Sequence, residues 1–208
     1  MSNIVFYGDS ITDCGRNREL DALMGYGYPA LVTGRLSVEN PEKDSFFNRG
    51  ISGNRIVDLY AQINGVLNLS PDVISILIGV NDVWHKFSSN NGVDTPKFEK
   101  VYSLLIEEFL EKFPNVKIMI LEPFLTRASQ IEAYYEEFRA EVEEKAKAAR
   151  RIAEKFSLPF VELQEMLDNL YNPENPSYWL RDGVHPTHAG HTLIADAWIE
   201  TYNKYFKD

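Results

Sequence analysis

Short apolar runs alternate along this chain with longer segments whose apolar residues recur at helical spacing. The strand-like runs cover residues 3–7, 45–48, 72–78, 116–121 and 159–162. The helix-like segments cover residues 29–38, 55–68, 95–113 and 130–156, and a last one begins at Pro186. Such alternation predicts a parallel sheet with helices on both of its faces. Because no repeat or linker interrupts the pattern, we expect one α/β domain over residues 1–208.

The composition argues against several classes of partner. The net charge of −10 over 208 residues disfavours a nucleic-acid backbone or an anionic membrane surface. The one cysteine, Cys14, allows no internal disulfide and suits a reducing compartment, and we expect it to be a small packing residue. No basic segment followed by an apolar stretch opens the chain, and no apolar run is long enough to span a bilayer. We therefore expect a cytoplasmic protein whose oligomeric state stays open, a homo-oligomer included.

The turn after the first strand is the first candidate for chemistry. The run at residues 3–7 meets the sequence GDSITD at residues 8–13. This pattern is typical of a strand that enters a tight turn and a helix start. The turn puts Ser10 at the carboxyl end of a strand, where open α/β sheets place their active sites. Ser10 is therefore a candidate nucleophile whose backbone N–H also faces the oxyanion, although a plain helix cap would need the same residue.

Further candidates follow later strands or precede the last helix. Gly53 follows the second strand, Asn81 follows the third, and Asp182 and His185 lie three residues apart. Acyl transfer needs a nucleophile, a base, a carboxylate to orient the base, and donors for the oxyanion. Ser10, His185 and Asp182 fit the first three roles. The N–H of Gly53 and the amide of Asn81 fit the last role, although each of them alone is also typical of a turn or cap.

Three histidines, His185, His188 and His191, recur every third residue, which raises a metal site as an alternative. On a helix three residues turn through ~300° and six through ~240°, so the first and last rings would diverge by ~120°. Pro186 also places His185 at or before the first helical turn. We therefore predict no metal and no cofactor, with His188 and His191 on the helix surface or supporting the site.

Together these blocks resemble the SGNH hydrolases, also called the GDSL esterase/lipase family. The sequences GDSI (8–11), Gly53, GVND (79–82) and DGVHP (182–186) match the four family blocks in order, so the resemblance covers essentially the whole chain. It implies a flavodoxin-like α/β/α sandwich with a five-stranded parallel sheet, and a serine esterase without a metal. It also implies that the N–H groups of Ser10 and Gly53 and the Asn81 side chain form the oxyanion hole.

Within this family, several stretches look most like intracellular carbohydrate acetylesterases that act on acetylated xylo-oligosaccharides. These are GDSITDCGR (8–16), NRGISGN (48–54), GVNDVW (79–84) and HPTHAGH (185–191). The loops at residues 15–28 and 171–181 depart more, and loops determine substrate choice. The resemblance implies an esterase that removes a short acyl group, foremost acetyl, from a small-molecule sugar ester.

Candidate substrate-binding residues are Asp9, Tyr26, Trp84 and Trp179, with Tyr28 as a further aromatic ring. Aromatic rings at a pocket mouth can stack on sugars, but packing would explain each of these rings equally well. Two alternatives to the sugar esterase stay open. A lysophospholipase or thioesterase would need an apolar groove or a membrane-binding face. A non-catalytic carbohydrate-binding protein would not need the complete set of catalytic residue types that this chain keeps.

Overall fold

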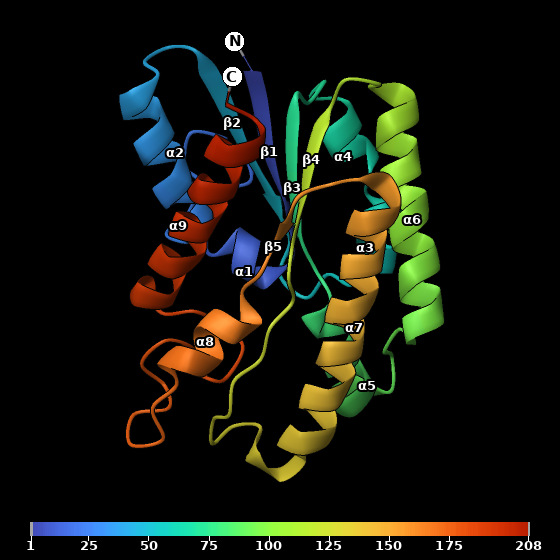
Figure 1. Cartoon of the computed structure of the whole chain (residues 1–208), viewed down its shortest axis with the longest axis vertical. Helices are drawn as coiled ribbons and strands as arrows, with labels where there is room; N and C mark the ends of the chain where they lie inside the picture. The colour runs from blue at the N-terminus through green and yellow to red at the C-terminus, as the bar shows by residue number, and fades with distance from the viewer. Residues whose placement is uncertain (1, 208) are drawn as a thin grey trace.

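The computed structural model describes residues 2–207 and contains a sheet of five parallel strands (Figure 1). The strands are β1 (Ser2–Gly8), β2 (Asp44–Gly50), β3 (Val73–Leu77), β4 (Lys117–Leu121) and β5 (Phe160–Val161). Their order across the sheet is β2-β1-β3-β4-β5. This is the flavodoxin-like order, whose switch point lies between β1 and β3. The predicted parallel sheet and its five strands are confirmed, with small differences at the strand ends.

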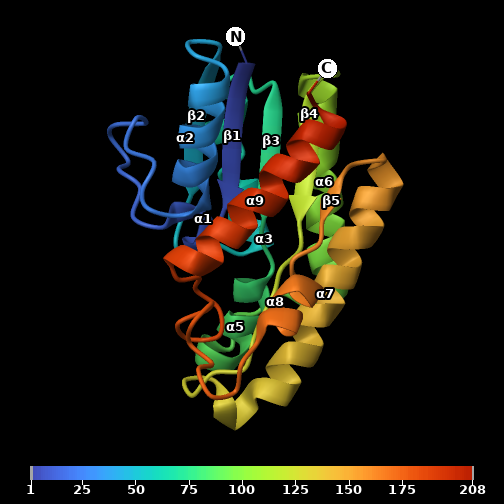
Figure 2. The same ribbon diagram turned by 60° about the vertical axis from the view of Figure 1, so that its left-hand side comes forward.

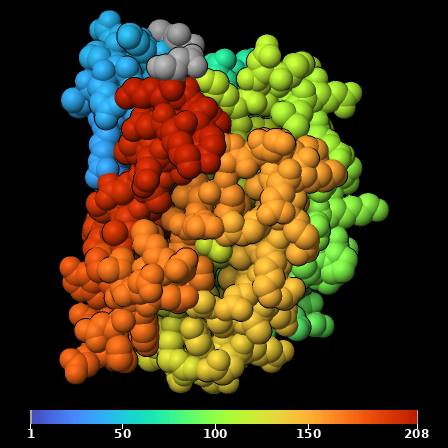
Figure 3. Space-filling view, viewed as in Figure 1, coloured from blue at the N-terminus to red at the C-terminus, as the bar shows by residue number. Residues whose placement is uncertain are grey.

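Helices cover both faces of the sheet and make three layers (Figures 1 and 2). On one face, α2 (Tyr28–Glu39) and α9 (His188–Tyr205) lie side by side. On the other face lie α3 (Ile56–Ala61), α6 (Thr95–Lys112) and α7 (Tyr135–Phe156). In the space-filling view, α9 and the segments from α7 onward make up most of the visible face of the molecule (Figure 3). The predicted α/β/α sandwich is therefore confirmed.

The central strand β1 is buried on both faces. The ring of Phe6 points toward α2 and α9, with its centroid 5.5 Å from Trp198 and 5.9 Å from Tyr28. The next residue, Tyr7, points to the opposite layer and lies 6.4 Å from Phe109. Burial of each large apolar side chain contributes roughly 1.5–3 kcal/mol. Tyr28 is thus a fully buried core residue, and the expectation that it could stack on a sugar at the pocket mouth is wrong.

The predicted helix over residues 55–68 is two helices in the structure. The first, α3, ends at Ala61, and the second, α4, spans Asn64–Leu67. Gln62 caps the end of α3 with a non-helical φ of −107°. The break therefore lies at Gln62 and Ile63, and Ile63 precedes α4 as its N-cap residue without a side-chain capping bond.

The last helix begins two residues later than the sequence predicts. Its first residue is His188, and the side chain of Thr187 caps it by accepting a hydrogen bond from the backbone N–H of Gly190 at 3.3 Å. Pro186 instead forms an antiparallel bridge with Leu180. The segment before α9 is therefore a closed turn that holds Asp182 and His185 outside any helix.

Two helices, α5 (Val80–Ser89) and α8 (Gln164–Leu170), are absent from the sequence-based prediction. The residue before α5, Gly79, has no side chain that could cap it, and α8 is only seven residues long. Neither helix therefore has both the capping residue and the long apolar stripe from which a helix is predicted. The predicted helix over 130–156 also starts with a 3₁₀ turn, η1 (Glu132–Tyr134), before α7 begins.

The longest helices, α6, α7 and α9, each bury one stripe of apolar side chains. Charged residues occupy their other faces, as is usual for helices that pack on a sheet. In the part of the chain that the structure describes, no helix is both long and apolar enough to cross a membrane.

Candidate active site

Three neighbouring strand ends carry the candidate residues. Gly8 at the end of β1 is in register with Gly50 of β2 and Leu77 of β3. Ser10 follows β1 by two residues, and Gly53 follows β2 by three. Because parallel strands end at the same edge of a sheet, the chain gathers these residues at the switch point of the fold.

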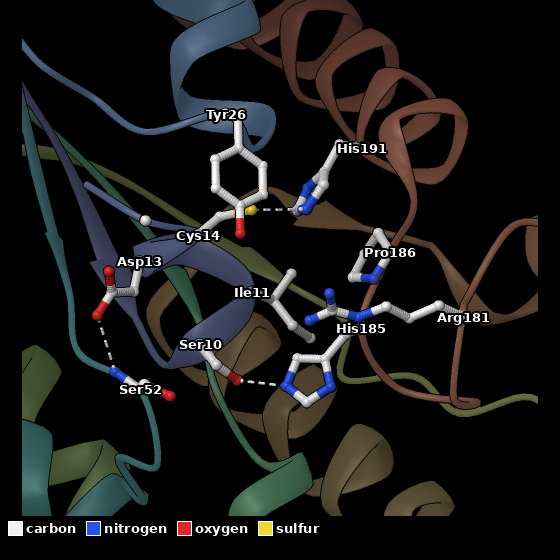
Figure 4. A pocket seen from close by; sticks show the side chains of 11 residues that line it. Ser10, Ile11, Asp13, Cys14, Tyr26, Ser52, Arg181, His185, Pro186 and His191 are labelled. Atoms are coloured by element: carbon white, nitrogen blue, oxygen red, sulfur yellow. Dashed lines mark hydrogen bonds between the residues drawn. The ribbon is translucent and has the colours of Figure 1, made fainter. Parts of the chain in front are cut away.

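The turn after β1 sets the position of Ser10. Asp9 caps the short helix α1 (Ser10–Asp13), and its Oδ1 accepts a hydrogen bond from the backbone N–H of Ile11 at 2.9 Å. Ser10 is consequently the first residue of α1, and its side chain points away from the sheet toward His185 (Figure 4). A side chain at Gly8 would collide with the Leu77 carbonyl and with Thr12. The close approach of β1 to its neighbour thus requires glycine directly before this turn.

Ser10, His185 and Asp182 lie in one continuous chain of hydrogen bonds. Ser10 Oγ is 2.9 Å from His185 Nε2, and His185 Nδ1 is 2.7 Å from Asp182 Oδ2. The other carboxylate oxygen of Asp182 accepts from the backbone N–H groups of Val184 (3.1 Å) and His185 (2.8 Å). Gly183 allows this tight turn because its φ is +89°, and a side chain there would meet the Thr126 carbonyl at 2.5 Å.

The electrostatics of this turn determine which tautomer His185 adopts. Burial of Asp182 by itself raises the carboxyl pKa, but hydrogen bonds from the ring and backbone of His185 outweigh burial and bring the pKa to about 2. Asp182 is therefore ionised at neutral pH and accepts a hydrogen bond from the Nδ1–H of His185. The Nε2 atom of His185 is then left as an acceptor for the Ser10 hydroxyl.

Asn81 and Gly53 lie on the two turns that flank this chain of hydrogen bonds. Asn81 is in the first turn of α5, and one of its Nδ2 hydrogens is donated to the Asn54 carbonyl at 3.1 Å. Asp82 accepts from the backbone N–H of Ile56, at 3.1 and 3.2 Å for its two oxygens. These bonds tie the turn after β2 to the turn after β3. Gly53 lies on the first of these turns with a φ of +85°.

A cavity of about 200 Å³ lies over Ser10 and His185 (Figure 4). Most of its lining is polar, and it comes from the turn after β1, the loop before α2, the turn after β2 and the segment before α9. The lining residues are Ser10, Ile11, Asp13, Cys14, Gly15, Tyr26, Ser52, Arg181, His185, Pro186 and His191. The arrangement can hold a small polar substrate against the Ser10 hydroxyl, which is already hydrogen-bonded to the His185 imidazole.

A profile of the GDSL-like Lipase/Acylhydrolase family matches residues 6–193. The chain belongs to the GDSL-like lipase/acylhydrolase family. An acetylxylan esterase from Geobacillus stearothermophilus is 33% identical over 207 residues, which cover 94% of this chain and 91% of that protein. On these grounds the chain is a carboxylic ester hydrolase.

Solved structures agree with this family. A putative GDSL-like lipase from Parabacteroides merdae superposes with a TM-score of 0.85 and 34% identity, covering 96% of this chain and 94% of that one. The acetylxylan esterase Axe2 from G. stearothermophilus gives a TM-score of 0.82 and 33% identity, covering 96% and 93%. LAE5, an α/β hydrolase from the metagenome of Lake Arreo in Spain, gives 0.83 and 31%, covering 96% and 94%.

The predicted substrate-binding residues of this GDSL-like esterase separate into two groups. Tyr26 lines the cavity, whereas Trp84 is not among its lining residues but packs beside the imidazole of His185, with ring centroids 5.8 Å apart. Trp179 is not among the lining residues, and its indole N–H donates to the Leu170 carbonyl at 2.9 Å. Asp9 is 1% exposed and lies below the Ser10 turn. The structure thus contradicts direct substrate contact by Asp9, because its carboxylate faces the protein interior.

Two buried carboxylates, Asp9 and Asp82, lie next to the candidate site residues. Burial raises the pKa of Asp9 to about 7, although the hydrogen bond from Ile11 opposes the shift. Burial also raises the pKa of Asp82 to about 8 against the Ile56 N–H and the positive charge of Lys145. Both carboxylates lie next to a candidate catalytic residue in the sequence and hold backbone N–H groups in place. Their role in the structure is therefore to fix the turns that carry Ser10 and Asn81.

Of the two places that the sequence left open for His191, the structure excludes the helix surface, because this residue is 2% exposed and lies against the cavity. Its Nδ1 accepts from the backbone N–H of Tyr28 at 3.1 Å, so its Nε2 carries the proton and faces Cys14 Sγ at 3.2 Å. Cys14 also lines the cavity, and burial raises its pKa to about 11. The thiol is therefore protonated at neutral pH, which fits the expected packing role better than a nucleophile.

Sequence reasoning missed three polar residues of the cavity, Asp13, Ser52 and Arg181. Each is a close neighbour in the sequence of a predicted site residue. Asp13 lies three residues after Ser10, and Arg181 directly precedes Asp182. The sequence offered one signal for these residues, which is that they lie next to the blocks that resemble the family. Only the fold shows which of these neighbours line the cavity.

Proposed function

We propose that this GDSL-like esterase removes acetyl groups from carbohydrates through a Ser-His-Asp triad and an acyl-enzyme. The observation that carries the proposal is the chain of hydrogen bonds from Asp182 through His185 to Ser10, at 2.7 and 2.9 Å. The similarity to an acetylxylan esterase supports an acetylated sugar as the substrate. A mostly polar cavity of about 200 Å³ also suits a sugar ester better than a long acyl chain.

In the first half of the reaction, Ser10 Oγ attacks the ester carbonyl while His185 Nε2 takes the hydroxyl proton. Asp182 holds the imidazole in place and stabilises the imidazolium that forms. The negative charge moves to the carbonyl oxygen, and fixed donors stabilise it most when the charge is fully developed. We assign this oxyanion hole to the N–H groups of Ser10 and Gly53 and to the second Nδ2 hydrogen of Asn81.

Collapse of the tetrahedral intermediate breaks the bond to the sugar oxygen, and His185 returns its proton to that oxygen. The sugar leaves with a free hydroxyl, and the acetyl group stays on Ser10. Water then attacks the acyl-enzyme, with His185 again taking a proton. The second collapse releases acetic acid and restores the Ser10 hydroxyl.

The substrate and place of action belong to the same proposal. A small acetylated sugar is the proposed partner, and neither a nucleic acid nor a membrane is needed for the chemistry. We place the activity in the cytoplasm, since the single Cys14 makes no disulfide and suits a reducing compartment.

A panel of esters tests the proposal. We expect kcat/KM to fall from p-nitrophenyl acetate to butyrate to octanoate, and acetate to be released from acetylated xylo-oligosaccharides. Ser10→Ala should abolish turnover on every ester while its circular dichroism spectrum and melting curve stay those of the parent protein. Highest activity on octanoate would favour a lysophospholipase or thioesterase instead. Sugar binding without any hydrolysis would favour a non-catalytic carbohydrate-binding protein.

A further inference from the structure

Arg181 is the unpaired cation of the active-site cavity. It lines the cavity one residue before Asp182, and its backbone N–H donates to the His185 carbonyl at 3.0 Å. Its exposed side chain extends from this turn toward the middle of the cavity (Figure 4). Within residues 2–207, every other arginine side chain is hydrogen-bonded or ion-paired to a carboxylate or a carbonyl oxygen, whereas the guanidinium of Arg181 has no such acceptor. Arg16, for example, donates to the Gly50 carbonyl, and Arg49 donates to Asp21.

The groups around this guanidinium leave its charge uncompensated. The charge of Arg181 reaches the Cys14 thiol and the His191 imidazole, and burial keeps both of them neutral at pH 7. The carboxylate of the cavity, Asp13, already accepts from the backbone N–H of Ser52 at 3.1 Å and from Arg18 at 3.2 Å. Arg181 therefore retains its full capacity to bind an anion that enters with the substrate.

The position of Arg181 also indicates which part of the substrate it meets. In the proposed reaction, His185 returns its proton to the oxygen of the leaving alcohol, so the alcohol lies on the His185 side of Ser10. Arg181 shares the turn of His185 and lines the same cavity. A planar guanidinium presents paired N–H donors that match the two oxygens of a carboxylate.

We propose that Arg181 binds a carboxylate on the alcohol part of the substrate, so that the enzyme prefers acetyl esters of acidic sugars, such as uronic acids, to those of neutral sugars. This inference rests on the proposed esterase function. The contact forms in the bound substrate as well as in the transition state. It therefore acts on KM more than on kcat.

Two aryl acetates that differ in one charge test the proposal. They are 4-acetoxybenzoate and its uncharged methyl ester, and the measured quantity is the ratio of their kcat/KM values. Comparing this ratio between the parent enzyme and Arg181→Gln cancels the difference in chemical reactivity between the two esters. We expect the ratio to fall about tenfold in Arg181→Gln, mainly through KM of the acidic ester. Arg181→Glu should lower it further, and about 0.5 M salt should weaken the preference of the parent enzyme.

The matched control is Arg151→Gln. Arg151 pairs with Glu99 between α6 and α7, so this variant loses the same charge away from the cavity. It should keep the parent ratio. Equal ratios in the parent enzyme and Arg181→Gln, with both esters hydrolysed, would overturn the role of Arg181 and leave the esterase proposal intact. Failure of the parent enzyme to hydrolyse either ester would overturn both proposals.

Discussion

His185 Nδ1 lies 2.7 Å from Asp182 Oδ2, although only Gly183 and Val184 separate the two residues in the sequence. The same carboxylate also accepts from the backbone N–H of His185, at 2.8 Å. Asp182 thus contacts its partner through both ring and backbone, and it is absent from the lining of the cavity. This geometry supports the proposal that Asp182 acts on the substrate only through His185.

The first prediction follows from that contact. Asp182→Asn should lower kcat roughly 10²–10⁴-fold, because the amide no longer holds His185 in the tautomer that can take the Ser10 proton. The double variant Asp182→Asn/His185→Ala should be little slower than His185→Ala alone, since the effects of substitutions in residues that act as one unit do not add. Steady-state kinetics on p-nitrophenyl acetate measures both effects. Additive losses in this cycle would mean that Asp182 has a separate task, such as binding substrate.

The second prediction concerns the dependence of stability on pH. Burial lowers the pKa of His191 from an ordinary 6.5 to about 4. Between these values the unfolded chain binds a proton that the folded protein rejects, so the free energy of unfolding falls as the pH decreases. Relative to His191→Gln, the parent protein should lose roughly 2–3 kcal/mol between pH 7.5 and pH 4. Urea unfolding at several pH values measures this difference.

A difference between variants is needed because two other groups act in the opposite direction. Burial raises the pKa values of Asp9 and Asp82, so the folded protein binds protons that the unfolded chain lacks, and these groups favour folding as the pH falls. They are common to parent and variant and cancel. If the free energy of unfolding depended on pH in the same way in the parent and in His191→Gln, the result would contradict the burial of a neutral imidazole.

The sequence predicted correctly those strands and site residues that a short run of neighbouring residues is enough to identify. The strand at 72–78 is apolar at nearly every position, which only a strand buried on both faces requires, and β3 confirms it. Ser10, His185 and Asp182 were found for the same reason, because each lies in a short block at a strand end or a turn. The structure brings these three together, while their catalytic roles stay predictions.

What the sequence did not reveal depends on distant parts of the chain. His191 is buried because Cys14 and Tyr28, more than 160 residues away, close over its ring. Whether Arg181 has a partner likewise depends on which carboxylates the fold brings near it. The predicted start of α9 was wrong for a local reason. Pro186 is a typical first residue of a helix, but Thr187 is the cap, because its side chain accepts a hydrogen bond from the Gly190 N–H.

The third prediction is that the enzyme needs no metal. His185 Nε2 is 2.9 Å from Ser10 Oγ, while His191 uses both ring nitrogens on Tyr28 and Cys14. These two imidazoles therefore turn toward different partners and cannot share one ion without breaking those contacts. Dialysis against a chelator should leave kcat and KM on p-nitrophenyl acetate unchanged. Activity that is lost on dialysis and restored by zinc would overturn the prediction.

The last prediction separates catalysis from turn stability at Asn81. If the free Nδ2 hydrogen of Asn81 faces the oxyanion, Asn81→Ala should lower kcat by about 10²–10³-fold, or ~3–4 kcal/mol, with little change in KM. The reason is that the oxygen carries its full negative charge only in the tetrahedral intermediate. Gly53 donates through its backbone, and no atom lies within 4 Å of an added Cβ. Gly53→Ala should therefore act through strain at its φ of +85°.

The alternative is that Asn81 only holds the turn after β2 through its bond to the Asn54 carbonyl at 3.1 Å. Asn81→Ala would then cost about 1 kcal/mol of unfolding free energy, the usual worth of one such hydrogen bond, with turnover nearly intact. Measuring kcat and thermal unfolding on the same preparation distinguishes the two roles, because only the first lowers kcat a hundredfold. A stable and fully active Asn81→Ala enzyme would remove Asn81 from the mechanism and leave the backbone N–H groups of Ser10 and Gly53 as the oxyanion donors.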